Sequence, residues 1–329
     1  MGEFSHQLCL KCLNNSYLQK NANMEKRKFL PGEVHHTYQR GISGFNIFYE
    51  IEDYLVYYTI FSVLSKRYNI IVYGLCLMID HIHSLCSALD RSSFARFYSC
   101  VTMRFVKEYQ KEHQICGSIF SERFGSAPKV GLKLLRTAIA YLYNNPVERH
   151  LCKYAQEYRW NFLAYANSNS PFSDSLVVRN SSASLQRSLK EVDGSVKRGD
   201  FLSYAQLRRM FMTLDIREKS QLVDYIIKKY SVIRYDILVS KCYDGYSNML
   251  TAINSNAGSE YDISEYRWGK SDVEYRELYR FMYRQGYSSA GEIISLDIDT
   301  KIKLHSEMSR YTHATTHQIC KFLHLPVKR

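Results

Sequence analysis

Two strand-length apolar runs follow one another in residues 69–87, and a single charged residue, Asp80, separates them. The first run, residues 69–79, reads NIIVYGLCLMI, and the second, residues 81–87, reads HIHSLCS. Short apolar runs with β-branched residues, bounded by a polar residue, are typical of neighbouring strands. The pair therefore predicts a buried sheet and restricts the fold to classes that contain one.

Strands and helices alternate around this pair up to about residue 165. The pattern predicts further strands at residues 36–39 and 117–124, and helices at residues 50–68, 91–114 and 131–145. The last helix is expected to stop at Pro146, because proline cannot donate to the helical hydrogen-bond ladder. Such alternation is typical of α/β or α+β layers.

Composition divides the chain into four parts. Residues 1–30 are polar and Asn-rich and are expected to form a flexible tail, whereas residues 31–166 hold the alternating pattern. Residues 167–199 are rich in Ser and Asn, which is typical of a linker. Residues 200–329 have helical periodicity and predict an all-α domain. Its final part, residues 300–324, has the proportions of a helix-turn-helix or of a small helical packing module.

The formal net charge of +12 favours a polyanionic partner such as nucleic acid. No apolar run approaches the ~20 residues that cross a bilayer, and the N-terminus lacks the apolar segment of a secretion signal. Nine irregularly spaced cysteines fit a reducing compartment rather than a disulfide framework. We therefore expect a cytoplasmic protein with no membrane partner. Cys9 and Cys12 are either half of a zinc site or part of a flexible tail.

Two histidines of the second run share one face of the predicted strand. Residues i and i+2 of a strand point to the same side, so His81 and His83 project together and Ile82 points away. Two neutral imidazoles side by side are a common beginning of a divalent metal site. A purely structural role is the alternative, because a His-x-His pair alone is weak evidence.

The helix before Pro146 offers groups of a second kind. At about 100° per residue, Tyr141 and Asn145 lie only about 40° apart on one face. Both border the apolar stripe, which consists of Leu134, Leu135, Ala138, Ile139 and Leu142. Tyr143 lies about 160° from Asn145, on the other border. If Asn145 joins the histidines at a metal, Tyr141 is the tyrosine placed beside it.

Five ordered segments resemble motifs of the REP-associated tyrosine transposases, which are single-tyrosine HUH transposases. Residues 74–86, which hold the two histidines, resemble the LMPNHxH strand pair of that family. Residues 32–41 are similar to its opening strand, and residues 120–124 to its FqgRY segment. Residues 141–147 resemble its YIHxNPV helix, and residues 160–165 its WSSyxaY close.

The resemblance implies an α+β, ferredoxin-like domain with a central antiparallel sheet. It also implies a Mg²⁺ or Mn²⁺ ion held by His81, His83 and Asn145, with Tyr141 as the nucleophile that attacks a DNA phosphate. The chain departs from the family where Asp80 replaces the usual Asn, where Tyr143 replaces the common His, and where Glu-Arg-His at 148–150 replaces RAG. Asp80 either tunes the metal or caps a turn, and Tyr143 is either a second nucleophile or a packed aromatic.

Several basic residues are candidate DNA contacts, with a solvated surface charge as the alternative for each. In the HUH-like part they are Arg40, Arg104, Lys107 and Arg123. A row of arginines runs beside Tyr275, Tyr279 and Tyr283, and either faces water or lies against a phosphate backbone; it consists of Arg276, Arg280 and Arg284. In the final helix, which Thr315 is expected to cap, the candidates are Thr316, His317 and Lys321.

These features together predict a bacterial, nucleoid-associated enzyme that cuts and rejoins single-stranded DNA, at hairpin or palindromic ends, through a 5′-phosphotyrosine intermediate. One alternative is a non-catalytic DNA-binding regulator on an HUH scaffold. Another is an initiator of the rolling-circle or relaxase type, which would share the same chemistry. Both a homodimer and a monomer remain open.

Overall fold

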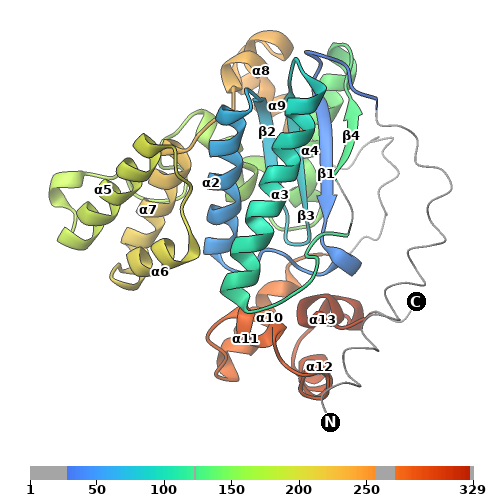
Figure 1. The fold of residues 1–329 in the computed structure, drawn as a ribbon, viewed down its shortest axis with the longest axis vertical. Helices are drawn as coiled ribbons and strands as arrows, with labels where there is room; N and C mark the ends of the chain where they lie inside the picture. The colour runs from blue at the N-terminus through green and yellow to red at the C-terminus, as the bar shows by residue number, and fades with distance from the viewer. Residues whose placement is uncertain (1–27, 122–123, 256–270, 327–329) are drawn as a thin grey trace.

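A four-stranded antiparallel sheet carries the histidine segment near its centre (Figure 1). The computed structural model describes residues 28–121, 124–255 and 271–326. The predicted strands at residues 36–39, 69–79 and 81–87 are present. The sheet has the order β2-β3-β1-β4, with bounds β1 His35–Arg40, β2 Ile71–Leu77, β3 His81–Ser87 and β4 Gly125–Pro128.

The fourth strand lies outside the range that we predicted. Among the described residues of this range, 117–121 and 124, only Phe120 forms an isolated bridge, to Gly41, and the paired strand β4 follows at Gly125–Pro128. This strand consists of small residues and a proline, so it has no apolar alternation to detect. It pairs with β1 alone and forms an edge of the sheet, where proline is tolerated.

Helices cover both faces of the sheet. On one face lie α2 (Ile51–Arg67) and α3 (Arg91–His113), which stand in front of the strands in Figure 1. On the other face lies α4 (Leu132–Glu148), with α8 (Tyr235–Cys242) and α9 (Tyr246–Ser255) packed against it. None of the described helices combines the length and apolar character that a bilayer crossing requires.

Helix α4 does not stop at Pro146, as we expected, but continues to Glu148. Proline within the last turn removes only one hydrogen bond of the ladder, and the following residues close the helix. The Arg149 N–H donates to the Asn145 carbonyl at 3.1 Å, and the Leu151 N–H donates to the Pro146 carbonyl at 2.9 Å. Tyr141 and Asn145 therefore lie in a continuous helix.

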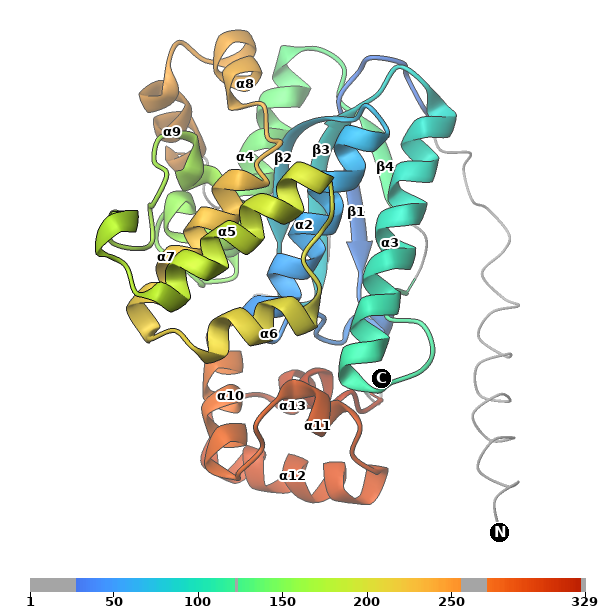
Figure 2. The same ribbon diagram turned by 60° about the vertical axis from the view of Figure 1, so that its left-hand side comes forward.

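The chain after residue 166 is largely helical. The segment 167–199 is not a linker throughout, because its second half forms α5 (Ala183–Arg198), which Ser182 caps. Helices α6 (Tyr204–Met212) and α7 (Ile216–Lys229) follow and contact α2, whereas α5 packs against α7 (Figure 2). Four short 3₁₀ turns connect α4 to α5; they are Ala155–Glu157, Arg159–Asn161, Leu163–Ala166 and Val178–Asn180. A fifth, η1 (Ile42–Gly44), follows β1.

The last described helices lie together at one end of the sheet (Figure 2). Their bounds are α10 Glu274–Arg284, α11 Ala290–Ile294, α12 Ile298–Tyr311 and α13 Thr316–Leu323. The Thr315 hydroxyl accepts from the Gln318 N–H, so the predicted cap of α13 is confirmed. This is the end at which β1 stops and β3 starts, so the C-terminal helices lie beside His81.

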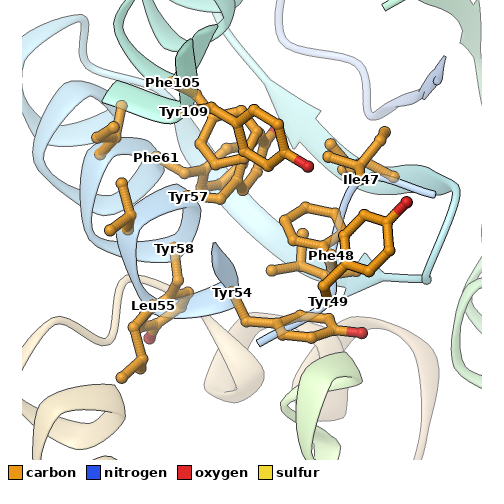
Figure 3. Packing of buried hydrophobic residues seen from close by; sticks show 14 of the residues in the cluster. Ile47, Phe48, Tyr49, Tyr54, Leu55, Tyr57, Tyr58, Phe61, Phe105 and Tyr109 are labelled. Atoms are coloured by element: carbon orange, nitrogen blue, oxygen red, sulfur yellow. The ribbon is translucent and has the colours of Figure 1, made fainter. Parts of the chain in front are cut away.

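One buried cluster joins the sheet to the C-terminal helices. Close to the sheet it is strongly aromatic, as Figure 3 shows for Phe48, Tyr57 and Phe105. The same cluster extends to Leu222 of α7 and Phe322 of α13. Aromatic side chains bury large apolar areas, so this contact contributes strongly to stability.

A fully buried carboxylate, Asp53, holds four donors from three parts of this core. Its Oδ2 accepts the N–H groups of Tyr49 and Glu50 at 2.8 and 2.9 Å. Its Oδ1 accepts the hydroxyl of Tyr204 from α6 at 2.7 Å and lies 3.2 Å from Nε2 of His113 in α3. Asp53 thereby links the start of α2 to two other helices.

Candidate functional site

Strand β3 directs its two histidines to the α4 side of the sheet. Ile82 belongs to the core on the α2 and α3 side, as the alternation of a strand requires. The rings of His81 and His83 lie edge to face with their centroids 4.9 Å apart. Both residues are buried, with 3% and 0% of their surfaces exposed.

Helix α4 brings Tyr141 and Asn145 to the same place. The ring centroid of Tyr141 lies 5.3 Å from that of His83, and Oδ1 of Asn145 lies 3.4 Å from Nε2 of His81. The Asn145 amide donates to the carbonyl of Tyr141 at 3.0 Å, which turns its oxygen toward His81. The structure thus unites the four residues that we predicted as metal ligands and nucleophile.

Tyr143 lies in a different environment. It is fully buried in the core between α4 and the sheet, and a Cβ atom on Gly74 of β2 would lie 3.4 Å from its hydroxyl. Burial raises the pKa of Tyr143 far above its usual value. Of its two predicted roles, the geometry favours the packed aromatic. The predicted apolar stripe of α4 is also buried except for Leu134, which is half exposed.

Strand β1 adds a third imidazole that our sequence analysis did not assign to the site. Nε2 of His36 lies 3.0 Å from Nδ1 of His83, and the two rings stack. The ring of His36 also meets Tyr141 edge to face at 5.6 Å. Burial, aided by the charge of Lys129, lowers the pKa of His36 to about 3, so this imidazole is neutral. Burial likewise lowers the pKa of His83 well below its usual value.

Asp80 forms an ionic cluster at the start of β3. Its Oδ1 lies 2.5 Å from Nδ1 of His81, and its Oδ2 accepts from Nζ of Lys321 at 3.1 Å. A guanidinium nitrogen of Arg40 lies 3.5 Å from the same Oδ2. Burial alone would raise the pKa of Asp80, but these neighbouring cations and His81 hold it well below the usual value. Arg40 and Lys321, both predicted DNA contacts, therefore pair with Asp80.

A second ionic pair lies on the C-terminal side of the site. Asp272, which precedes α10, lies 3.7 Å from a guanidinium nitrogen of Arg149, and the Asp272 N–H donates to the Arg149 carbonyl. Burial, followed by repulsion from Asp80, raises the pKa of Asp272 to about 6. Arg149 also interacts electrostatically with Asp80 and Tyr141. Arg149, which lies where the chain departs from the motif that it resembles, thus interacts electrostatically with Tyr141, the predicted nucleophile.

Two further predicted DNA contacts lie on the face of the sheet opposite the histidines. Arg104 and Lys107 are exposed on α3, which covers the opposite face of the sheet. Arg123 lies outside the described residues, as do Cys9 and Cys12 and nearly all of the predicted tail at residues 1–30. The arginines of α10 are exposed; they are Arg276, Arg280 and Arg284.

The tyrosines beside those arginines differ from one another. Tyr275 is buried and Tyr279 partly buried, whereas Tyr283 is 53% exposed. In α13, Thr316 is exposed, whereas the side chain of Lys321 is only 12% exposed. A lysine held in this way does not present its charge on the outer surface of the helix pair α12–α13.

The donor atoms around His81 suit a divalent cation. With its Nδ1–H donating to Asp80, a neutral His81 presents the Nε2 lone pair toward Oδ1 of Asn145. Two acceptor atoms that face each other at 3.4 Å repel unless a cation or a proton lies between them. Across the described residues, no group of three or more His, Cys, Asp or Glu side chains is arranged to hold a metal. The predicted set differs because its third ligand is an amide oxygen.

Comparison with known proteins gives no match to a family model, to a curated protein or to a solved structure.

Proposed function

We propose that the chain is a metal-dependent single-stranded DNA transposase or endonuclease of the single-tyrosine HUH type. It would cleave and rejoin DNA at hairpin or palindromic ends through a 5′-phosphotyrosine intermediate. The observation that carries this proposal is the meeting of His81, His83, Asn145 and Tyr141, from β3 and α4, at one point. Such a set contains both the ligands and the nucleophile that the reaction needs.

The sheet supports the same proposal. The elements β1, α2, β2, β3, α3 and β4 follow one another in the order of a ferredoxin-like fold, and the strand order β2-β3-β1-β4 agrees with that fold. In the proposed family, the histidine pair lies on a central strand of such a sheet. A likeness of fold alone does not establish an activity, so the proposal rests on the side chains that meet between β3 and α4.

The chemistry follows from the residue types. His81, His83 and Asn145 would hold Mg²⁺ or Mn²⁺, which when bound neutralises phosphate oxygens and orients the scissile bond. The Tyr141 oxygen loses its proton and bonds to phosphorus while the bond to the 3′ oxygen breaks. The leaving 3′ oxygen keeps the bonding electrons and takes up a proton. Because one phosphate ester replaces another, the strand can be rejoined by reversal.

One observation favours the regulator as a second candidate. Tyr141 is only 5% exposed and Asn145 only 5%, so a DNA strand reaches the phenol only after covering residues move. A protein whose covering residues never move would bind DNA without cutting it.

The test is a covalent-adduct assay with labelled single-stranded hairpin DNA and Mg²⁺ or Mn²⁺. The wild type should form an SDS-resistant adduct, whereas Tyr141→Phe and His83→Ala should not. Tyr143→Phe is the matched control, because it removes a phenol oxygen from the same helix. An adduct that survives Tyr141→Phe but is lost in Tyr143→Phe would identify the other tyrosine as the nucleophile. DNA binding with no adduct on any substrate would favour the regulator.

A further inference from the structure

The last described helix, α13, reaches the start of β3 through one lysine. Lys321 lies 241 residues from Asp80 in sequence, yet its Nζ donates to Oδ2 of Asp80 at 3.1 Å. The two side chains are 12% and 6% exposed, so this ion pair is shielded from water. A shielded pair is held more firmly than a surface pair and depends more strongly on both partners.

Neighbouring contacts fix the position of this lysine. The carbonyl of the next residue, Phe322, accepts the hydroxyl of Tyr49 at 2.8 Å. Nε2 of His324 lies 3.0 Å from the carbonyl of Asn46. Contacts within three residues of Lys321 thus bind the end of α13 to residues 46–49. The approach of Lys321 to Asp80 is therefore part of the packing of α13 and does not depend on a mobile side chain alone.

The two carboxylate oxygens of Asp80 contact different groups. Oδ2 faces the cations Lys321 and Arg40, and Oδ1 faces Nδ1 of His81 at 2.5 Å. A carboxylate that accepts from one imidazole nitrogen keeps the proton there and leaves the other nitrogen as a lone pair. The other nitrogen, Nε2, is the one that faces Asn145.

We propose that Lys321 is a positioning residue that fixes Asp80 and, through it, the orientation and tautomer of His81. The C-terminal helices then form part of the site rather than a separate attachment. The effect on metal binding depends on the proposed function, whereas the effect on the His81 tautomer does not. Both effects follow from one hydrogen-bonded chain, Lys321–Asp80–His81.

The experiment uses the full chain and compares Lys321→Met with Lys321→Arg. Lys301→Met is the matched control, because Lys301 is a buried lysine of α12 whose Nζ donates to the Ile294 carbonyl at 2.7 Å. The first readout is the ¹⁵N NMR spectrum of the metal-free protein, in which His81 is assigned by its absence in His81→Gln. The second readout is Mn²⁺ affinity, measured by electron paramagnetic resonance.

Lys321→Met should shift the ¹⁵N resonances of His81, because Asp80 loses one of its two cationic partners. It should weaken Mn²⁺ binding by about 10-fold, the lower end of the usual cost of losing an outer-shell partner, because Lys321 acts through Asp80. Lys321→Arg keeps a cation at this position and should leave the His81 spectrum and the Mn²⁺ affinity close to those of the wild type. Lys301→Met should change neither readout. If Lys321→Met does not fold, Lys321→Gln replaces it, with the same direction of change expected because a neutral amide does not balance the carboxylate.

A folded Lys321 variant with the wild-type His81 tautomer and the wild-type Mn²⁺ affinity would overturn the proposal. If the wild type itself fails to bind Mn²⁺, the proposed function fails, and the metal-free NMR comparison still decides the role of Lys321.

Discussion

Replacing Tyr143 by Phe should stabilise the protein and leave its proposed chemistry intact. Tyr143 is fully buried on α4, and within residues 28–121, 124–255 and 271–326 its hydroxyl has no hydrogen-bond partner. The substitution removes that hydroxyl alone and keeps the ring in place. It therefore separates the two tyrosines that lie two positions apart on the same helix.

The expected gain follows from the burial. A buried polar group without a partner costs about 1–3 kcal/mol. Removing one oxygen leaves a cavity of about 10 Å³, which at about 24 cal/mol per Å³ costs only about 0.2 kcal/mol. The free energy of unfolding should therefore rise by about 1–3 kcal/mol in Tyr143→Phe.

Urea unfolding followed by circular dichroism measures this change, and the adduct assay on the same preparation measures the chemistry. Tyr141→Phe is the comparison, and it should abolish the adduct. A fall in unfolding free energy of more than about 1 kcal/mol in Tyr143→Phe, beyond the usual range for a neutral change, would refute the burial argument. Loss of the adduct in Tyr143→Phe would refute the assignment of Tyr141.

Three further outcomes are expected. Asp53→Ala strips four buried donors of their acceptor and should lower the free energy of unfolding by about 3–5 kcal/mol in urea; a loss below about 1 kcal/mol would contradict this. Burial lowers the pKa of His324 to about 4 in the folded state, whereas in the unfolded state it stays near 6.5. As the pH falls from 6.5 to 4, the unfolded state therefore binds more protons, and the free energy of unfolding decreases by up to about 3 kcal/mol. His324→Gln should flatten that slope in pH-dependent unfolding, and an unchanged slope would contradict it. Arg280→Ala and Arg284→Ala should each reduce the salt dependence of DNA binding by about one phosphate contact, and unchanged slopes would assign these arginines to solvent.

Short-range periodicity accounts for the part of the site that could be predicted from the sequence. The alternation of β3 places His81 beside His83, and the helical spacing of α4 places Tyr141 beside Asn145. Both relations are set by local backbone geometry. The contact between β3 and α4 is a tertiary contact, which local periodicity does not predict. We expected it only because the segments resemble those of a known family.

The contacts that escaped prediction are long-range or depend on register. His36 meets His83 because β1 pairs antiparallel with β3, with Tyr38 opposite His83. The doublet His35-His36 is evident in the sequence, but only the pairing register of β1 with β3 identifies which of the two rings faces α4. Lys321 has the pattern of a surface lysine on an amphipathic helix, and only the packing of α13 reveals its contact with Asp80. Edge strand β4 was missed because small residues carry no apolar signal.

The most direct measurement is the anomalous scattering of crystals of the full chain grown with Mn²⁺. We expect one strong peak bonded to His81 and His83 and close to the amide oxygen of Asn145, with the phenol of Tyr141 facing it. A peak at another place, or no peak while His81 still faces Asn145 directly, would contradict the proposed metal site.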